Sequence, residues 1–315
     1  MNDNSTLNCH LCHSADLKLI PGVRDFEFDR PCEKPLYGCR NCGVVAMYPM
    51  PEAKEIKTFY GDYHVYQDRR PKLIQLLVRV FNHFQRRDFV RRLKLRRGNI
   101  LDIGCATGTF LKTLERAGEF ELWGIDIDED AITECRRKGI NAHVGTIETV
   151  ALPKRHFDVI IMNNVIEHVP DPERLLRVCL DLLKPGGKVY GETPTTRCIS
   201  FYLSGRYWFG FHYPRHLFVF CQRNLLKIAA TAGFAQSHCY SVIHPGSWAV
   251  TMENIINEAL PRPLKRNRGR TILGAPMMLA FLPLNFIEVL FGAAGMMRFI
   301  LEKPAQAPET SKLPA

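Results

Sequence analysis

Apolar and polar positions are patterned most regularly between residues 98 and 195, where short apolar runs are separated by segments of helical spacing. The runs at 100–103, 122–127 and 157–162 are broken only by single polar or glycine positions. Such runs are typical of strands buried on both faces of a parallel sheet. Residues 225–234 have helical spacing, and 296–301 form a last apolar run. The pattern predicts an α/β fold with a sheet at its core.

Residues 73–84 have the spacing of an amphipathic helix, with arginines off the apolar face. The apolar positions are Leu73, Leu76, Leu77, Val80, Phe81 and Phe84. The pattern changes phase near Asp88, which predicts a bend or a second helix at that point.

The C-terminal part contains a second unusual pattern. Residues 271–287 carry no charge and are interrupted by Pro276 and Pro283, and five basic residues precede them between 262 and 270. A membrane-spanning helix needs about 20 apolar residues, so the segment predicts broken apolar helices instead. Such helices beside arginines suit insertion into a membrane surface, a lid over a hydrophobic acceptor, or packing on the sheet.

A glycine-rich turn follows the first apolar run, with Asp102, Gly104, Ala106 and Gly108 at alternating positions. Such a turn lets the backbone approach a ligand and aims the free N–H groups of a helix at it. Asp126 ends the next apolar run, 22 residues after Gly104, where an acidic side chain would hold a ribose. The sequence therefore predicts a nucleoside-binding domain. The Asp102 carboxylate disfavours a pyrophosphate and suits a cationic ligand.

These residues resemble the signature of the class I S-adenosylmethionine-dependent methyltransferases, an acidic residue followed by alternating glycines. Ala106 stands where that family most often has its middle glycine. Residues 157–169 resemble the family's fourth strand and the helix after it, and 183–189 resemble the turn into its fifth strand. The resemblance covers roughly residues 98–195. It implies a Rossmann-like, seven-stranded sheet that binds S-adenosylmethionine.

The resemblance also implies which residues contact the cofactor. Asp126 would hold the ribose, while Asp102, Gly104 and Asn163 or Asn164 would lie near the methionine end. Thr146 stands where the family usually has an acidic contact to the adenine. The expected cofactor-binding residues are Asp102, Gly104, Cys105, Ala106, Gly108, Asp126, Ile127, Thr146, Asn163 and Asn164.

An aromatic loop at 207–220 is the expected acceptor side of the site. It resembles the Tyr-x-x-His-Leu element of a methyltransferase branch that carries an N-terminal four-cysteine zinc ribbon. This branch includes C-methyltransferases of nucleotide-linked deoxysugars. The resemblance assigns the general base to His216, with Tyr213 beside it, although Arg215 stands where the branch has an acidic residue. His168, which follows Glu167, is an alternative base, and histidine suits the role because its ordinary pKa lies near neutrality.

The cysteines near the N-terminus predict a metal site. Cys9 and Cys12 form one Cys-x-x-Cys pair, and Cys39 and Cys42 form a second after 26 intervening residues. Two such turns complete a tetrahedral shell of four thiolates for a structural Zn²⁺. His10, His13 and Cys32 are spare candidates, but a four-thiolate site needs none of them. Eleven cysteines without a signal peptide indicate a reducing, cytoplasmic compartment.

The net charge of +10 is concentrated in residues 69–97, which hold eleven Lys or Arg and one acidic residue. This surface fits a solvated helix face, anionic headgroups or a substrate diphosphate, or nucleic acid. We expect a small-molecule acceptor, phosphate- or lipid-linked, and peripheral contact with the inner face of a membrane through 262–297. An RNA acceptor is less favoured because residues 163–165 read Asn-Asn-Val and not the Asn-Pro-Pro-aromatic signature of base-amine methylation. A cofactor-binding protein without catalytic activity is a third alternative.

We therefore predict a methyltransferase that acts on a sugar, nucleotide-sugar or glycolipid precursor. The alternative acceptors are a quinone or another lipid, modified on oxygen, and RNA. The predicted division of the chain is a zinc ribbon (1–50), a tyrosine-rich linker with a basic amphipathic helix (51–97), a cofactor-binding domain (98–245), C-terminal apolar helices with the last strand (246–302), and a disordered tail (303–315).

Overall fold

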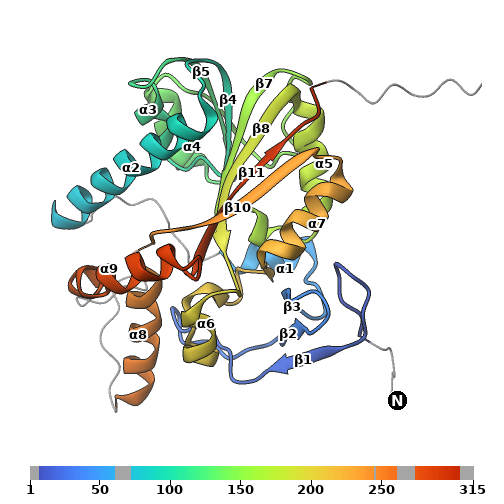
Figure 1. The fold of residues 1–315 in the computed structure, drawn as a ribbon, viewed down its shortest axis with the longest axis vertical. Coiled ribbons are helices and arrows are strands. Elements are labelled where there is room, and N and C mark those ends of the chain that lie inside the picture. Colours follow the sequence, from blue (N-terminus) through green and yellow to red (C-terminus); the bar gives the residue numbers. More distant parts are fainter. Residues whose placement is uncertain (1–6, 61–71, 245, 261–273, 306–315) are drawn as a thin grey trace, which may run out of the picture.

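The computed structural model describes residues 7–60, 72–244, 246–260 and 274–305 (Figure 1). Its main sheet has the order β6-β5-β4-β7-β8-β11-β10. The strands are β4 (Arg97–Ile103), β5 (Glu119–Asp126), β6 (Asn141–Val144), β7 (Phe157–Asn163), β8 (Leu183–Pro194), β10 (Gln236–Val242) and β11 (Met296–Glu302). The first five strands in this order are parallel, and β11 is antiparallel to both neighbours. The predicted seven-stranded α/β sheet, with its last strand from residue 296, is confirmed.

Helices cover both faces of this sheet (Figure 1). Helices α2 (Lys72–Leu93), α3 (Thr109–Leu114) and α4 (Glu129–Arg137) lie on one face, and α5 (Pro172–Leu182) and α7 (Gln222–Ala232) lie on the other. Helix α5 begins with Pro172 at its first turn and an Asp171 carboxylate that accepts from the Arg174 N–H. The predicted Gly233 ends α7 with φ of 112°, which favours glycine.

The bend predicted near Asp88 was wrong, because α2 runs without a break through this residue. The Asp88 carboxylate accepts hydrogen bonds from the Tyr190 and Tyr240 hydroxyls and from Arg298. A polar cluster therefore interrupts the apolar stripe, while Phe89 beside it is fully buried. The side chains predicted on the apolar face at 73–77 and 81 lie outside the described residues. The two remaining positions on that face, Val80 and Phe84, are 45% and 61% exposed.

A smaller antiparallel sheet joins the N-terminal segment to the rest of the chain. It has the order β1-β2-β3-β9, with β1 (Leu17–Ile20), β2 (Leu36–Cys39), β3 (Val45–Met47) and β9 (Phe218–Val219). The last strand comes from the aromatic loop, and the Met47 N–H donates to the Leu217 carbonyl at 3.0 Å. The cysteine-containing segment thus shares a sheet with the loop that carries His216.

Helices α1 (Ala53–Thr58), α6 (Ile199–Ser204), α8 (Gly246–Ala259) and α9 (Gly274–Leu290) complete the described chain, with 3₁₀ turns at Ile166–His168, Gly205–Tyr207 and Phe209–Phe211. The predicted interruption at the prolines was wrong, because α9 includes Pro276 near its start and continues through Pro283. Proline is tolerated in a first turn, and at Pro283 it removes one backbone donor without ending the helix. Within the described ranges, none of the helices combines the length and apolarity required to span a membrane. The predicted tail lies outside the described residues from 306 onward.

Candidate active site

The turn between β4 and α3 has the close backbone packing that a ligand-binding loop needs. Gly104, Ala106 and Gly108 have φ values of 70°, 52° and 67°, in the left-handed region. The N–H groups of Gly104 and Cys105 both donate to the Ile125 carbonyl, at 2.8 and 3.1 Å. A Cβ atom at Gly104 would stand 3.0 Å from the Val165 side chain. The turn is thus held against the ends of β5 and β7.

Asp126 is fixed at the end of β5 by two backbone donors. Its Oδ2 accepts from the Ala106 N–H at 2.9 Å and its Oδ1 accepts from the Asp128 N–H at 3.0 Å. Burial raises the pKa of Asp126, and burial followed by the Asp126 charge raises the pKa of Asp102 well above its usual range. Two desolvated carboxyl groups side by side attract a cation and hydroxyl donors. S-adenosylmethionine, which has a sulfonium, an ammonium and a ribose diol, matches this environment.

The other expected cofactor residues fall into two groups. Asn163 at the end of β7 has a buried Oδ1 without a hydrogen-bond partner among the described residues. Asn164, with φ of 55°, donates its N–H to the Glu192 carbonyl. Ile127 and Thr146 are exposed beyond the ends of β5 and β6. These four residues lie at the carboxyl edge of the sheet, where ligands bind in open α/β folds.

Cys105 and Gly108 have packing roles that the sequence did not reveal. The Cys105 Sγ lies 3.8 Å from the Cys135 Sγ, inside the core. A Cβ atom at Gly108 would stand 2.3 Å from the Ile140 side chain. The Cys105 side chain and a Cβ atom at Gly108 would both point toward the segment that contains α4 and Ile140. Only the backbone of these two residues therefore remains for ligand contact.

The structure brings the two candidate bases together. His168 ends the 3₁₀ turn after β7, and His216 lies within the aromatic loop, yet their ring centroids are 4.7 Å apart. The His216 Nδ1 donates to the Gly210 carbonyl at 2.8 Å, and the His168 Nδ1 donates to the Arg215 carbonyl at 2.9 Å. A carbonyl can only accept, so each Nδ1 carries the proton and each Nε2 keeps its lone pair. The Tyr60 hydroxyl oxygen lies 2.9 Å from the His168 Nδ1 as well and accepts from the same N–H.

Glu167 completes this cluster, and sequence reasoning gave it no role of its own. It is fully buried, and its Oε1 lies 4.0 Å from the His216 Nε2. Its Oε2 accepts from the Thr193 hydroxyl at 3.0 Å, whereas Oε1 has no hydrogen-bond partner among the described residues. Burial raises the pKa of Glu167 to about 8 and lowers the pKa of His168 to about 4. Burial, then the neighbouring histidines, holds the pKa of His216 well below its usual range.

The loop that carries His216 is anchored to the N-terminal segment. The Arg215 guanidinium is buried and donates to the carboxylates of Asp25 and Glu27. The Tyr213 hydroxyl accepts from the N–H groups of Glu33 and Lys34, at 2.9 and 3.0 Å. Tyr213 therefore contacts the ribbon segment through its hydroxyl. The acidic partners of Arg215 lie about 190 residues earlier in the chain, so no local sequence signal could identify them.

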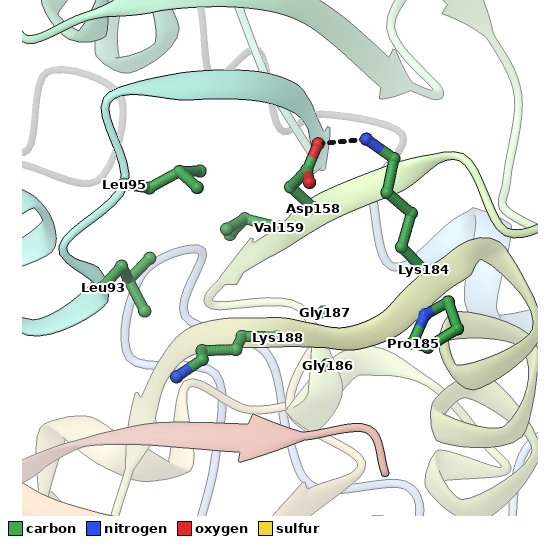
Figure 2. Close-up of a pocket in the computed structure, with 9 residues that line it drawn as sticks. All are labelled: Leu93, Leu95, Asp158, Val159, Lys184, Pro185, Gly186, Gly187 and Lys188. Carbon is green, nitrogen blue, oxygen red and sulfur yellow. Dashed lines mark hydrogen bonds and ion pairs between the residues drawn. The ribbon is translucent and has the colours of Figure 1, made fainter. Parts of the chain in front are cut away.

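A small hollow at the opposite end of the sheet has a structural role (Figure 2). It is lined by residues that precede β4 and by the starts of β7 and β8, including Leu93, Asp158 and Lys184. Asp158 and Lys184 form an ion pair at 2.6 Å, and Asp158 also accepts from the Asn99 N–H. The candidate site lies at the carboxyl edge, away from this hollow.

The chain resembles known methyltransferase domains in sequence. A family model described as a methyltransferase domain matches residues 68–238, more than half of the chain. The chain belongs to this methyltransferase family. Ubiquinone biosynthesis O-methyltransferases are among its relatives: that of Coxiella burnetii (strain Dugway 5J108-111) is 32% identical over 109 residues, 33% of this chain and 46% of the relative. That of Xanthomonas oryzae pv. oryzae (strain PXO99A) is 33% identical over 116 residues, 34% of this chain and 48% of the relative. The chain thus spans about half the length of the curated relatives it matches.

Similar solved structures include a possible histamine N-methyltransferase from Thermotoga maritima. It has a TM-score of 0.49 and 18% identity, over 79% of this chain and 99% of that one. A geranyl diphosphate C-methyltransferase from Streptomyces coelicolor A3(2) has a TM-score of 0.48 and 13% identity, over 70% of this chain and 76% of that one.

The four predicted cysteine ligands of the chain lie together. Their Sγ atoms are all within 4.8 Å of one another, with Cys9–Cys42 at 3.6 Å and Cys12–Cys39 at 3.5 Å. Tetrahedral Zn²⁺ with Zn–S bonds of about 2.3 Å requires sulfur separations of roughly 3.8 Å. The spare candidates have other contacts: the His10 ring meets the Met47 carbonyl and stacks on Tyr48, and the Cys32 thiol donates to the Lys34 carbonyl. The donor set therefore fits Zn²⁺.

Proposed function

We propose that the chain transfers a methyl group from S-adenosylmethionine to a small-molecule acceptor. The observation that carries this proposal is the juxtaposition of two clusters at one sheet edge. Asp102 and Asp126 form a desolvated pair of carboxyl groups at the cofactor site, and Glu167, His168 and His216 lie beyond the neighbouring strand β7. When bound, S-adenosylmethionine supplies an electrophilic methyl group on a sulfonium. An acceptor electron pair forms the new bond while the methyl–sulfur bond breaks, which releases S-adenosylhomocysteine.

Each cofactor residue has a distinct role in this proposal. Asp126 accepts the ribose hydroxyls through the lone pairs that its two backbone donors leave free. Asp102 offsets the positive charge of the methionine end. Asn163 directs its Oδ1, which is buried, toward an N–H or O–H group of the ligand. Positioning accounts for most of the rate enhancement of such an in-line displacement.

The Glu167–His168–His216 cluster is the proposed acceptor site. A hydroxyl or carbon acid must lose its proton before or during methyl transfer, and the Nε2 lone pairs of the two histidines are available to promote this. His216 is the first candidate for this role. Tyr213 and Arg215 hold its loop against the ribbon segment.

The leading acceptor class is a sugar, nucleotide-sugar or glycolipid precursor, by resemblance to the zinc-ribbon branch. A quinone or other lipid acceptor, modified on oxygen, is the second candidate, and the names of the curated relatives favour it. We propose no nucleic-acid acceptor, because the strand-end sequence Asn163-Asn164-Val165 lacks the base-amine signature.

The test is isotope transfer from S-adenosylmethionine that carries a heavy methyl group. The full chain is incubated with a native extract, which is then separated into nucleotide-sugar, lipid and RNA fractions for mass spectrometry. Label in the sugar or lipid fraction, reduced at least about tenfold by His216→Gln, would support the proposal. Label found only in the RNA fraction would overturn the proposal. So would a chain that binds the cofactor but transfers no label to any fraction.

We also propose that Zn²⁺ at the four cysteines is structural. Four thiolates close the tetrahedral shell and leave no position for an acceptor. The metal would tie the turns before β1 and after β2 together, and thereby support the sheet that β9 joins.

Finally, we propose that the C-terminal helices contact an anionic membrane surface. Leu290 and Phe291 at the end of α9 are 68% and 79% exposed, and Tyr202 and Leu203 of α6 are 75% and 73% exposed. Helices α6, α8 and α9 lie at one end of the molecule, and the Ile199 N–H donates to the Ala293 carbonyl (Figure 1). The basic residues between 262 and 270 connect α8 to α9 in sequence and suit anionic headgroups.

Vesicle flotation tests this surface. The chain should float with phosphatidylglycerol vesicles and less with phosphatidylcholine vesicles, and Leu290→Ser with Phe291→Ser should abolish flotation. Leu19→Ser, which changes an exposed apolar residue of β1, is the matched control. Equal flotation of the double variant and the wild type would contradict the proposal.

A further inference from the structure

We propose that Glu167, His168 and His216 form a second metal site, which binds a divalent first-row transition-metal cation distinct from the zinc of the four cysteines. The metal site rests on the proposed function in one respect, which is that the methyl acceptor binds beside these three residues. One ligand atom from each residue lies within 4.8 Å of the other two. The three residues come from two separate segments, the turn after β7 and the loop before β9, which the fold brings together.

The orientation of both imidazoles is that of metal ligands. A ligating histidine usually donates its other ring N–H to a carbonyl or carboxylate, which fixes the ring and directs the free nitrogen at the metal. His216 donates Nδ1–H to the Gly210 carbonyl, and His168 donates Nδ1–H to the Arg215 carbonyl. Both rings thus have the supporting contact already in place, and the free nitrogen is Nε2 in each.

The third donor is an oxygen whose bonding is incomplete without a ligand. Glu167 is fully buried, and its Oε2 accepts from Thr193, which orients the carboxyl group. Its Oε1 has no hydrogen-bond partner among the described residues and faces the His216 Nε2 at 4.0 Å. This separation is too long for a hydrogen bond. It leaves room for one cation between the two atoms, at a bond length of about 2.1 Å to each.

The donor set indicates the class of cation. Two imidazoles and one carboxylate suit Mn²⁺, Fe²⁺, Co²⁺ or Zn²⁺, whereas Mg²⁺ and Ca²⁺ prefer oxygen donors. Three protein ligands leave coordination positions open, in contrast to the closed shell of the four cysteines. A methyl acceptor with a hydroxyl group next to a second oxygen would suit the open coordination positions, since both of its oxygens can bind one cation.

This site changes how the acceptor becomes a nucleophile. The bound cation withdraws electron density, so the acceptor hydroxyl releases its proton to solvent as its oxygen binds. The oxygen then uses its electron pair to form the new bond to the methyl carbon, and the methyl–sulfur bond breaks. His216 would thus act as a ligand, with no need to take the proton itself.

Cobalt binding by the full chain, with its cysteine site already loaded with zinc, tests the proposal. Co²⁺ is titrated in the absence of methyl donor and acceptor while visible absorption and bound metal are measured. We expect one further equivalent of Co²⁺ with weak visible bands and without sulfur-to-cobalt charge transfer. Glu167→Gln and His216→Gln should each weaken binding at least about tenfold, and His143→Gln, a histidine of β6, should bind as the wild type does.

The wild-type titration decides the question even if a variant fails to fold. Absence of a second equivalent in the zinc-loaded wild type would overturn the metal site. Unchanged Co²⁺ affinity in a folded Glu167→Gln variant would overturn it as well. The proposed function has a separate readout, since isotope transfer by a chain that binds no second metal would leave methyl transfer intact and reject only the cation.

Discussion

The Arg215 guanidinium and the Asp25 carboxylate form a buried ion pair between residues that are 190 positions apart in the chain. Both carboxylate oxygens of Asp25 accept from Arg215 at 3.3 Å, and the two side chains are each 1% exposed. Arg215 precedes His216 directly, and its carbonyl accepts from His168. The ribbon segment thus contributes a charge that holds the backbone between the two histidines. An acidic residue of the ribbon segment is thus the buried partner of this arginine.

Asp25→Asn should lower the free energy of unfolding by about 3–5 kcal/mol, because it leaves the Arg215 charge buried without its main partner. Glu27, whose carboxylate also accepts from Arg215, retains part of the pairing. Methyl transfer should fall while S-adenosylmethionine affinity stays within about twofold, since Asp126 lies on a different strand. Urea unfolding and calorimetric titration measure the two effects.

A double variant serves as the control for Asp25. Asp25→Leu combined with Arg215→Met removes both charges and should recover most of the lost stability, because apolar side chains can replace a buried ion pair. If Asp25→Asn alone were as stable as the wild type, the pair would not anchor the His216 loop.

Asp126→Ala should weaken S-adenosylmethionine binding by roughly 10- to 100-fold. This corresponds to a loss of about 1.5–3 kcal/mol of binding free energy, the usual contribution of a hydrogen bond to a charged group. The variant also releases the Ala106 N–H, which donates to Asp126 in the wild type. Glu121→Gln on the exposed part of the same strand is the matched control. Calorimetry with the cofactor alone gives the affinity, and an unchanged dissociation constant for Asp126→Ala would contradict the cofactor site.

The sequence predicted the parts of this fold that depend on local pattern. The strand, glycine turn and acidic residue at 100–126 lie together because their order along the chain already places them at one sheet edge. The four cysteines were predictable because paired spacing encodes a tetrahedral site. The Glu167 role and the Asp25–Arg215 pair were not predictable, since they depend on the tertiary position of distant loops. The continuous helix through Asp88 was missed because its polar partners lie on three other strands or loops of the fold.

Cys12→Ser should release the structural zinc and lower the free energy of unfolding by more than about 3 kcal/mol, since loss of a structural metal is among the largest single-residue effects. The ribbon sheet contains β9, so the His216 loop should lose order with it. Zinc analysis after gel filtration and thermal unfolding measure the result. Cys32→Ser is the control because this exposed thiol, which donates to the nearby Lys34 carbonyl, is not one of the four clustered cysteines. Full zinc content in the Cys12 variant would exclude a four-thiolate site.

The Asp88 carboxylate should make the free energy of unfolding decrease at acidic pH. Although burial raises its pKa, hydrogen bonds from Tyr240 and Arg92 and the Arg298 charge outweigh this and hold the pKa of Asp88 at about 2, below the ordinary 3.8. A carboxylate with a lowered folded-state pKa stabilises the protein above its unfolded pKa, and this contribution disappears as pH falls from about 4 to 2. The difference corresponds to about 2 kcal/mol, and roughly half of it should be lost by pH 3.

The comparison that isolates this effect is urea unfolding of the wild type and Asp88→Asn at pH 6 and pH 3. The wild-type advantage should shrink by about 1 kcal/mol between these values, because the variant has no proton to gain at position 88. Asp16→Asn is the matched control, since the Asp16 side chain is 59% exposed and lies 3.8 Å from Arg40. A difference between Asp88→Asn and the wild type that stays constant with pH would show that the hydrogen bonds from Tyr190, Tyr240 and Arg298 do not favour the charged Asp88 carboxylate.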